Sequence, residues 1–126
     1  MSLTVLAIDD SRTIREMLNA ALSEAGFLVH LAVDGQDGLD KLGETAPDVV
    51  ITDINMPKLD GFGFIKGARA RQDYCAVPIL VLTTESAADL KARARDAGAT
   101  GWIVKPFDEM RLISAIQRVA GLRAAG

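Results

Sequence analysis

The fold of this chain is decided by Val49-Val50-Ile51-Thr52-Asp53-Ile54-Asn55-Met56-Pro57. The stretch begins with apolar residues that do not alternate with polar ones, which is typical of a strand buried on both faces in the middle of a parallel sheet. Asp53 ends this strand with a carboxylate, and residues 55–61 after it are rich in turn-forming residues. Because open parallel sheets bind ligands just outside the carboxyl ends of their strands, Asp53 is placed for chemistry.

The composition is that of an ordinary globular domain. The chain has 126 residues, of which 49% are hydrophobic and 25% charged, and this balance shows no bias toward disorder. The net charge of −3 argues against a nucleic-acid-binding surface, which would be basic. The lone Cys75 excludes an internal disulfide and suits a reducing compartment. No apolar segment approaches the roughly 18 residues that span a bilayer, and no signal sequence precedes the first strand. We therefore expect a cytoplasmic domain without membrane insertion.

Strands and helices alternate along the whole chain. Ser11 is expected to cap the first helix and Gly26 to end it. Ser86 with Asp89 resembles a capping box at the start of the fourth helix. Five strands that alternate with five helices predict a parallel sheet with helices on both faces. Besides the central strand, strands are expected at residues 3–8, 27–33, 77–82 and 100–104.

Polar side chains follow the strands at the point where each strand ends. Asp9 and Asp10 come directly after the first strand, Asp53 ends the third, Thr83 follows the fourth, and Lys105 follows the fifth. Clustered carboxylates repel one another and would raise their own pKa values unless a cation joined them. A hard divalent cation with oxygen ligands meets that need, and Mg²⁺ is the usual choice beside phosphate.

Together these motifs resemble the receiver domains of two-component response regulators, and they are most similar to the single-domain chemotaxis regulators of the CheY type. The resemblance covers essentially the whole chain, in order and at the family's spacings. It implies a doubly wound, flavodoxin-like α/β fold with a five-stranded parallel sheet of order 2-1-3-4-5. It also implies that residues 1–126 form a single receiver domain without an output domain. The motifs that carry the resemblance are Asp9-Asp10, Asp53, Met56-Pro57, Asp60-Gly61, Thr83 and Lys105-Pro106-Phe107.

The resemblance implies that a histidine kinase phosphorylates Asp53, since a carboxylate can attack phosphorus and form an acyl phosphate. It implies that Asp10 and Asp53 bind Mg²⁺, that Asp9 contributes through water and charge, and that Asn55 offers its backbone carbonyl. On the residues alone, other interpretations stay open. Asp53 also suits a turn, and the Asp9-Asp10 pair also suits the N-terminus of a helix.

Thr83 and Lys105 would bind the phosphoryl oxygens, and the resemblance places the Lys105–Pro106 bond in cis. Without a functional role, Thr83 would be a β-forming residue at a strand end, and Lys105 would be a surface lysine before a proline. Trp102 stands where the family carries a switch aromatic, usually tyrosine or phenylalanine, although a half-buried packing role would also explain it. Asn55 and Glu85 would flank the path of a water that attacks the phosphoryl group, so we expect a short-lived phosphoaspartate.

The partners implied by the resemblance are a CheA-like histidine kinase as phosphodonor and a protein target such as a flagellar switch component. The target would bind the fourth helix, the last strand and the last helix, around residues 87–95, 100–103 and 109–115. We expect a monomer that catalyses only its own phosphorylation and dephosphorylation, in chemotaxis or flagellar motor control.

Three other functions stay open at this stage. A stand-alone receiver can act as a phosphate sink or as an adaptor without a motor target, and the sequence separates this from chemotaxis poorly. An aspartate-dependent phosphatase usually needs two acids that flank one residue, whereas Asp9 and Asp10 are adjacent. A flavodoxin-like flavin binder would meet an acidic edge that is electrostatically wrong for a phosphate.

Overall fold

The computed structural model describes the backbone of residues 3–125 and the side chains of residues 3–121. Within residues 3–125, five strands alternate with five α-helices, as the sequence predicts, and one short 3-10 helix, η1, precedes the fourth strand. The elements are β1 (Thr4–Ile8), α1 (Arg12–Glu24), β2 (Leu28–Ala32), α2 (Gly35–Thr45), β3 (Val49–Thr52), α3 (Gly61–Ala70), η1 (Gln72–Tyr74), β4 (Ile79–Thr83), α4 (Ala88–Ala97), β5 (Gly101–Val104) and α5 (Glu109–Ala125).

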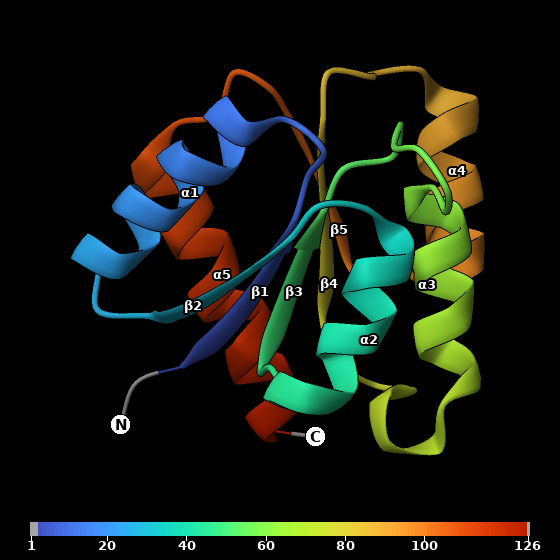
Figure 1. Cartoon of the computed structure of the whole chain (residues 1–126), viewed down its shortest axis with the longest axis horizontal. Coiled ribbons are helices and arrows are strands. Elements are labelled where there is room, and N and C mark those ends of the chain that lie inside the picture. The colour runs from blue at the N-terminus through green and yellow to red at the C-terminus, as the bar shows by residue number, and fades with distance from the viewer. Residues whose placement is uncertain (1–2, 126) are drawn as a thin grey trace.

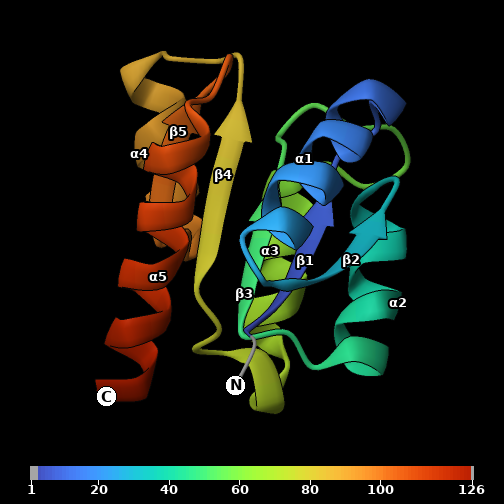
Figure 2. The ribbon, with the colours of Figure 1, turned by 90° about the vertical axis from the view of Figure 1, so that its left-hand side faces the viewer.

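The strands form one parallel sheet, and its order across the described chain is β2-β1-β3-β4-β5. The predicted order 2-1-3-4-5 is therefore confirmed. Helices α1 and α5 cover one face of the sheet, and α2, α3 and α4 cover the other (Figures 1 and 2). Since every strand runs in the same direction, all carboxyl ends of the strands lie at one edge of the sheet.

Two apolar cores, one on each face, hold the helices against the sheet. Strand side chains point alternately to the two faces, so that Leu6 packs with α2 and α3 while Val5 packs with α1 and α5. In β3, Val50 faces the first of these cores, and Val49 and Ile51 face the second. Each residue of β3 is buried, as its apolar sequence predicts.

Side-chain caps mark where α1, α2, α3 and α5 begin; at α5 the Arg111 amide donates to Asp108 Oδ1. Ser11 accepts a hydrogen bond from the Ile14 amide at the start of α1, and Gly26, with φ of +96°, follows its end. Both predictions are confirmed. Asp34 and Asp60 cap α2 and α3 in the same way.

The predicted capping box at the start of α4 is wrong. The N-cap of α4 is Ala87, which makes no side-chain capping bond. Ser86 therefore precedes the N-cap by one residue, and its hydroxyl is out of register with the amides that a capping box satisfies. Asp89 lies in the first turn, where its charge still suits the positive end of the helix dipole.

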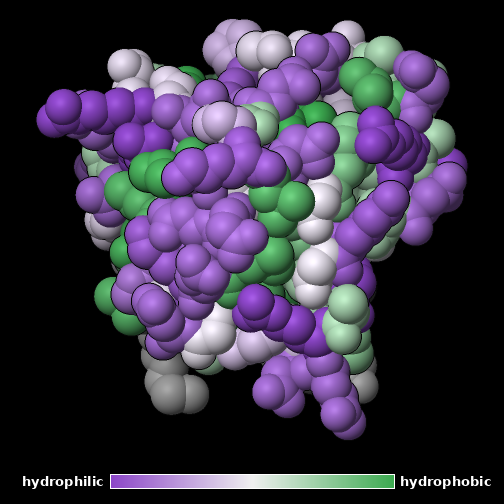
Figure 3. Space-filling model, turned by 45° about the vertical axis from the view of Figure 1, so that its right-hand side comes forward, coloured by the Kyte–Doolittle hydropathy of each residue, from purple (hydrophilic) through white to green (hydrophobic). Residues whose placement is uncertain are grey.

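Among residues 3–125, no helix combines the length and the apolar character that crossing a membrane requires. The face that Figure 3 presents is mostly hydrophilic, with hydrophobic side chains in small groups between the polar ones.

Candidate functional site

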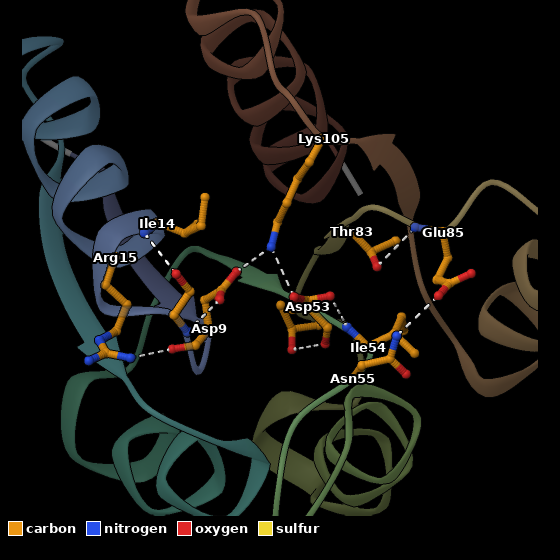
Figure 4. A network of polar contacts seen from close by, with 11 residues as sticks. Asp9, Ile14, Arg15, Asp53, Ile54, Asn55, Thr83, Glu85 and Lys105 are labelled. Carbon is orange, nitrogen blue, oxygen red and sulfur yellow. Dashed lines mark hydrogen bonds and ion pairs between the residues drawn. The ribbon is translucent and has the colours of Figure 1, made fainter.

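The predicted site residues come together at the edge of the sheet where the strands end (Figure 4). Asp9 is the first residue after β1, Asp53 the first after β3, and Lys105 the first after β5, while Thr83 is the last residue of β4. Because β1, β3 and β4 are neighbours in the sheet, residues far apart in sequence are brought within hydrogen-bonding reach. Asp10 follows Asp9 and is the exposed member of the group.

Lys105 lies at the centre of this group and forms ion pairs with two carboxylates. Its Nζ is 2.7 Å from Asp9 Oδ2 and 2.9 Å from Asp53 Oδ2. All three side chains are nearly buried, with 10% exposure for Lys105, 2% for Asp9 and 12% for Asp53. Burial disfavours the charged ammonium, but the hydrogen bonds to Asp9 and Asp53 outweigh this, and the pKa of Lys105 is raised.

Asp9 is the most deeply buried carboxylate of the site. Burial raises its pKa, against the opposing effect of the hydrogen bonds from Lys105 and from the Ser11 amide, which donates to Oδ1 at 2.9 Å. The charge of the nearby Asp53 raises the pKa of Asp9 further. A cation in this site therefore stabilises the ionised form of Asp9, and Lys105 supplies one.

The acidic side chains also have the geometry of a metal site. Carboxylate oxygens of Asp9, Asp10 and Asp53 all lie within 4.8 Å of one another. Hard oxygen donors with an open, partly hydrated side are the ligands that Mg²⁺ prefers in proteins. The donor set therefore fits Mg²⁺, and Asn55 lies in the adjoining loop that begins after β3.

The loop after Asp53 is closed by a glycine. The Gly61 amide donates to the Ile54 carbonyl at 2.8 Å, and a Cβ at Gly61 would clash with the Asp53 carbonyl oxygen. Asp53 is held further by the Ile54 amide, which donates to Oδ1 at 2.6 Å, and by the Thr52 hydroxyl, which donates to the Asp53 carbonyl at 2.8 Å. The glycine of the Asp60-Gly61 motif thus lets α3 begin directly against the backbone of Asp53.

A second network joins the loop after β4 to β5 and to the loop after β3 through Glu85. The Asn55 side-chain amide donates to Glu85 Oε1 at 3.3 Å, and the Glu85 amide donates to Thr83 Oγ1 at 3.4 Å. The Trp102 indole donates to the Glu85 carbonyl at 3.0 Å. Trp102 is half-buried against the core, so packing and a direct link to the site coexist at this residue.

Two backbone and side-chain features complete the site. The Lys105–Pro106 peptide bond is cis, which is the isomer that the resemblance implies. Arg15, which the sequence did not single out, donates from Nη1 to the Asp9 carbonyl oxygen at 2.7 Å. The sequence signal for this role is weak: a basic residue lies near the start of a helix, where the dipole disfavours it, and the first turn contains no acidic residue to pair with it.

Comparison with known proteins gives the family. The response regulator receiver domain family matches residues 5–117. The chain belongs to this family. The receiver domain is similar to the chemotaxis protein CheY4 of Vibrio cholerae, at 44% identity and a TM-score of 0.90, over 94% of this chain and 99% of that one.

A second solved structure similar to this receiver domain is the receiver domain of the sensor histidine kinase PA1611 from Pseudomonas aeruginosa. The identity is 26% and the TM-score 0.89, over 96% of this chain and 99% of that one. That structure holds a magnesium ion coordinated in its active-site cleft. The fold and the family predicted from the sequence are thus confirmed.

Curated relatives include the response regulator MprA of Mycolicibacterium vanbaalenii and of Mycobacterium tuberculosis. Both are 37% identical over 117 residues, which is 93% of this chain and 50% of theirs. The receiver domain thus spans about half the length of the curated relatives it matches. The proteins to which it is similar thus include a chemotaxis protein, a response regulator and a sensor histidine kinase.

Proposed function

We propose that this response regulator receiver domain accepts a phosphoryl group on Asp53 from a histidine kinase, with Mg²⁺ bound. The observation that carries the proposal is the position of the Asp53 carboxylate, 2.9 Å from Lys105 Nζ and within 4.8 Å of the carboxylates of Asp9 and Asp10. One nucleophile, one buried cation and a metal-binding acidic cluster at the same edge are the components of phosphoryl transfer to a carboxylate.

In the proposed reaction, a carboxylate oxygen of Asp53 attacks the phosphorus of a phosphohistidine on the kinase. The new oxygen–phosphorus bond forms as the phosphorus–nitrogen bond breaks, and the electron pair of the broken bond returns to the histidine nitrogen. Asp9, Asp10 and Asp53, with the Asn55 backbone carbonyl, would hold Mg²⁺, which when bound offsets the charge on the phosphoryl oxygens.

Lys105 and Thr83 are the proposed protein donors to the transferred group. Lys105 bonds both Asp9 and Asp53, so a small movement of its ammonium would bring it to a phosphoryl oxygen without exposing the charge to water. The Thr83 hydroxyl now accepts from the Glu85 amide and can turn to donate to the phosphoryl group. Both donors act where charge develops, which is where such groups accelerate transfer most.

Glu85 and Asn55 are proposed to set the lifetime of the phosphoaspartate. The Asn55 side-chain amide donates to Glu85 Oε1 at 3.3 Å, and the Glu85 amide bonds Thr83. We propose that the water that attacks the phosphoryl group passes beside this pair. A carboxylate and an amide in this place can orient such a water, which supports the expectation of a short-lived signal.

The proposed output surface is made by α4, β5 and α5, the elements that adjoin Trp102. The Trp102–Glu85 hydrogen bond connects this surface to the site. A shift of Glu85 on phosphorylation would therefore move or release the Trp102 indole. A hollow of about 680 Å³ lies where β5 meets α5, and Met110 at its border is 72% exposed. Its lining residues are Trp102, Ile103, Val104, Pro106, Phe107, Asp108, Met110, Arg111, Ser114, Ala115 and Arg118.

The similarity to CheY4 supports a role in chemotaxis, with a CheA-like kinase and a flagellar switch component as partners. The second candidate is a phosphate sink or an adaptor without a motor target. It is kept because the similar proteins also include a response regulator and a sensor-kinase receiver domain whose names do not mention chemotaxis. In both cases we propose that the receiver domain works in the cytoplasm as a monomer. As a chemotaxis regulator or an adaptor it would pass its signal by binding a protein, whereas as a phosphate sink it would only drain phosphoryl groups from the kinase.

Beryllium fluoride tests the proposed acceptor, since it binds an aspartate as an unreactive mimic of the phosphoryl group. With Mg²⁺ present, fluorine NMR should show a bound species for the wild type and none for Asp53→Asn. Trp102 fluorescence, recorded on the same samples, should change only in the wild type. A bound species that persists in Asp53→Asn would contradict Asp53 as the acceptor.

A further inference from the structure

Arg15 occupies a place that disfavours a positive charge. It is the fourth residue of α1, where the N-terminal end of the helix dipole repels cations. Its guanidinium nevertheless folds back toward the helix start, and Nη1 donates to the Asp9 carbonyl oxygen at 2.7 Å (Figure 4). A short bond of this kind from a charged donor is stronger than a neutral one, so the contact offsets the unfavourable location.

The carbonyl that Arg15 holds belongs to the peptide unit that joins Asp9 to Asp10. Because the peptide unit is planar, fixing its oxygen also fixes the amide nitrogen of Asp10 and the direction in which Asp10 leaves the strand. Asp9 has further restraints of its own, since its amide donates to the Ala32 carbonyl at 3.1 Å and its carboxylate accepts from the Ser11 amide and from Lys105.

Asp10 lacks such restraints. Its side chain is exposed, and among the described residues no hydrogen bond to its carboxylate is formed. The position of that carboxylate, within 4.8 Å of Asp9 and Asp53, therefore depends on the backbone that precedes it. Arg15 is the side chain that holds this backbone.

We propose that Arg15 is a positioning residue for the metal site: by holding the Asp9 carbonyl, it orients the Asp9–Asp10 peptide so that the Asp10 carboxylate meets those of Asp9 and Asp53. The inference rests on the proposed function, because it takes this acidic cluster to be a Mg²⁺ site. The charge of Arg15 acts in the opposite direction, since a cation beside the site repels Mg²⁺. When Arg15 is replaced by a neutral residue, loss of positioning should weaken Mg²⁺ binding, whereas loss of the charge should strengthen it.

Calorimetric titration of Mg²⁺ into the wild type and Arg15→Met separates the two effects. If Arg15 positions Asp10, the variant should bind Mg²⁺ about tenfold more weakly, as is common when a group that orients a ligand is lost. Arg15→Lys, whose ammonium can still donate to the Asp9 carbonyl, should recover most of the affinity. Arg15→Gln, with a shorter and neutral side chain, should resemble Arg15→Met.

Arg12→Met is the matched control. Arg12 lies on the same turn of α1 and pairs with Glu16 at 3.0 Å, and its side chain is 85% exposed. The variant loses the same charge from the same helix without touching Asp9, so its Mg²⁺ affinity should equal that of the wild type or exceed it slightly.

Thermal unfolding without metal, measured on each variant, shows which samples are folded. If Arg15→Met does not fold, the comparison of Arg15→Gln with Arg15→Lys decides in its place. Unchanged or tighter Mg²⁺ binding by the folded neutral variants would overturn the inference and leave the proposed function intact. A wild type that binds no Mg²⁺ would overturn the proposed metal site and the inference with it.

Discussion

Replacing Lys105 with methionine should destabilise the receiver domain in the absence of metal and make its stability depend more strongly on Mg²⁺ than that of the wild type. The change removes the ammonium that bonds Asp9 at 2.7 Å and Asp53 at 2.9 Å and keeps most of the apolar stem. Two nearly buried carboxylates then lose their counter-charge. Because burial already raises the pKa of Asp9, its ionised form becomes still less favourable.

The size of the effect follows from the burial of the three groups. Removing one partner of a buried ion pair costs roughly 3–5 kcal/mol. Asp53 keeps 12% exposure and can be partly hydrated, so we expect the lower end, about 3 kcal/mol. Mg²⁺ would replace the lost charge, and at a concentration of about 100 times its Kd it would restore about 2.7 kcal/mol. The two magnitudes nearly cancel, so Lys105→Met with saturating Mg²⁺ should be about as stable as the metal-free wild type.

Urea denaturation of the wild type and Lys105→Met, with a chelator and with saturating Mg²⁺, measures the free energy of unfolding lost without metal and the part that Mg²⁺ restores. The free-energy gap between the two proteins should shrink when Mg²⁺ is added, because in the wild type Lys105 competes with the metal for the same carboxylates. Lys66→Met, which removes an exposed lysine of α3, should change the free energy of unfolding neither with chelator nor with Mg²⁺. A Lys105→Met variant as stable as the wild type in chelator, or a gap that Mg²⁺ leaves unchanged, would refute this reasoning.

Three further predictions follow from the same site. Glu85→Leu removes the carboxylate that accepts from Asn55, so loss of radiolabel from phosphorylated protein should slow severalfold; an unchanged rate would refute the role of Glu85. Gly61→Ala places a Cβ against the Asp53 carbonyl, so it should lower the free energy of unfolding by about 2 kcal/mol or more, whereas Gly121→Ala, with open space around its Cβ, should not. Since the pKa of Lys105 is raised above 10.5, its contribution is fully present below that pH and is lost as pH rises through the folded-state pKa. Urea denaturation should therefore show this alkaline loss in the wild type and not in Lys105→Met.

Much of the fold follows from local sequence patterns, and the structure has the features that these patterns predict. The apolar run of β3 predicts burial on both faces because only a central parallel strand accommodates it, and the alternation of strands with helices fixes a parallel sheet. Once all strands run in one direction, Asp9, Asp53, Thr83 and Lys105 must share an edge. The composition of the site was therefore predictable from the sequence, although its contacts were not.

The contacts that escaped prediction depend on single-residue register or on side-chain conformation. The start of α4 lies one residue later than the Ser86 box requires, and a pattern of spacing cannot resolve such a shift. Arg15 reaches Asp9 because its side chain folds back over the helix start, which is a choice among rotamers. The bond between Trp102 and Glu85 joins a residue within β5 to the loop after β4, so only the folded chain shows it.

The most direct test of the account is intact-mass measurement after incubation with acetyl phosphate and Mg²⁺. Asp53→Asn and a chelated wild-type sample are the matched controls, and rapid acid quenching preserves a short-lived adduct. We predict the mass of one added phosphoryl group in the wild type and none in either control. A quenched wild type without the adduct, or an Asp53→Asn variant that gains it equally, would contradict phosphorylation of Asp53 as the function of this site.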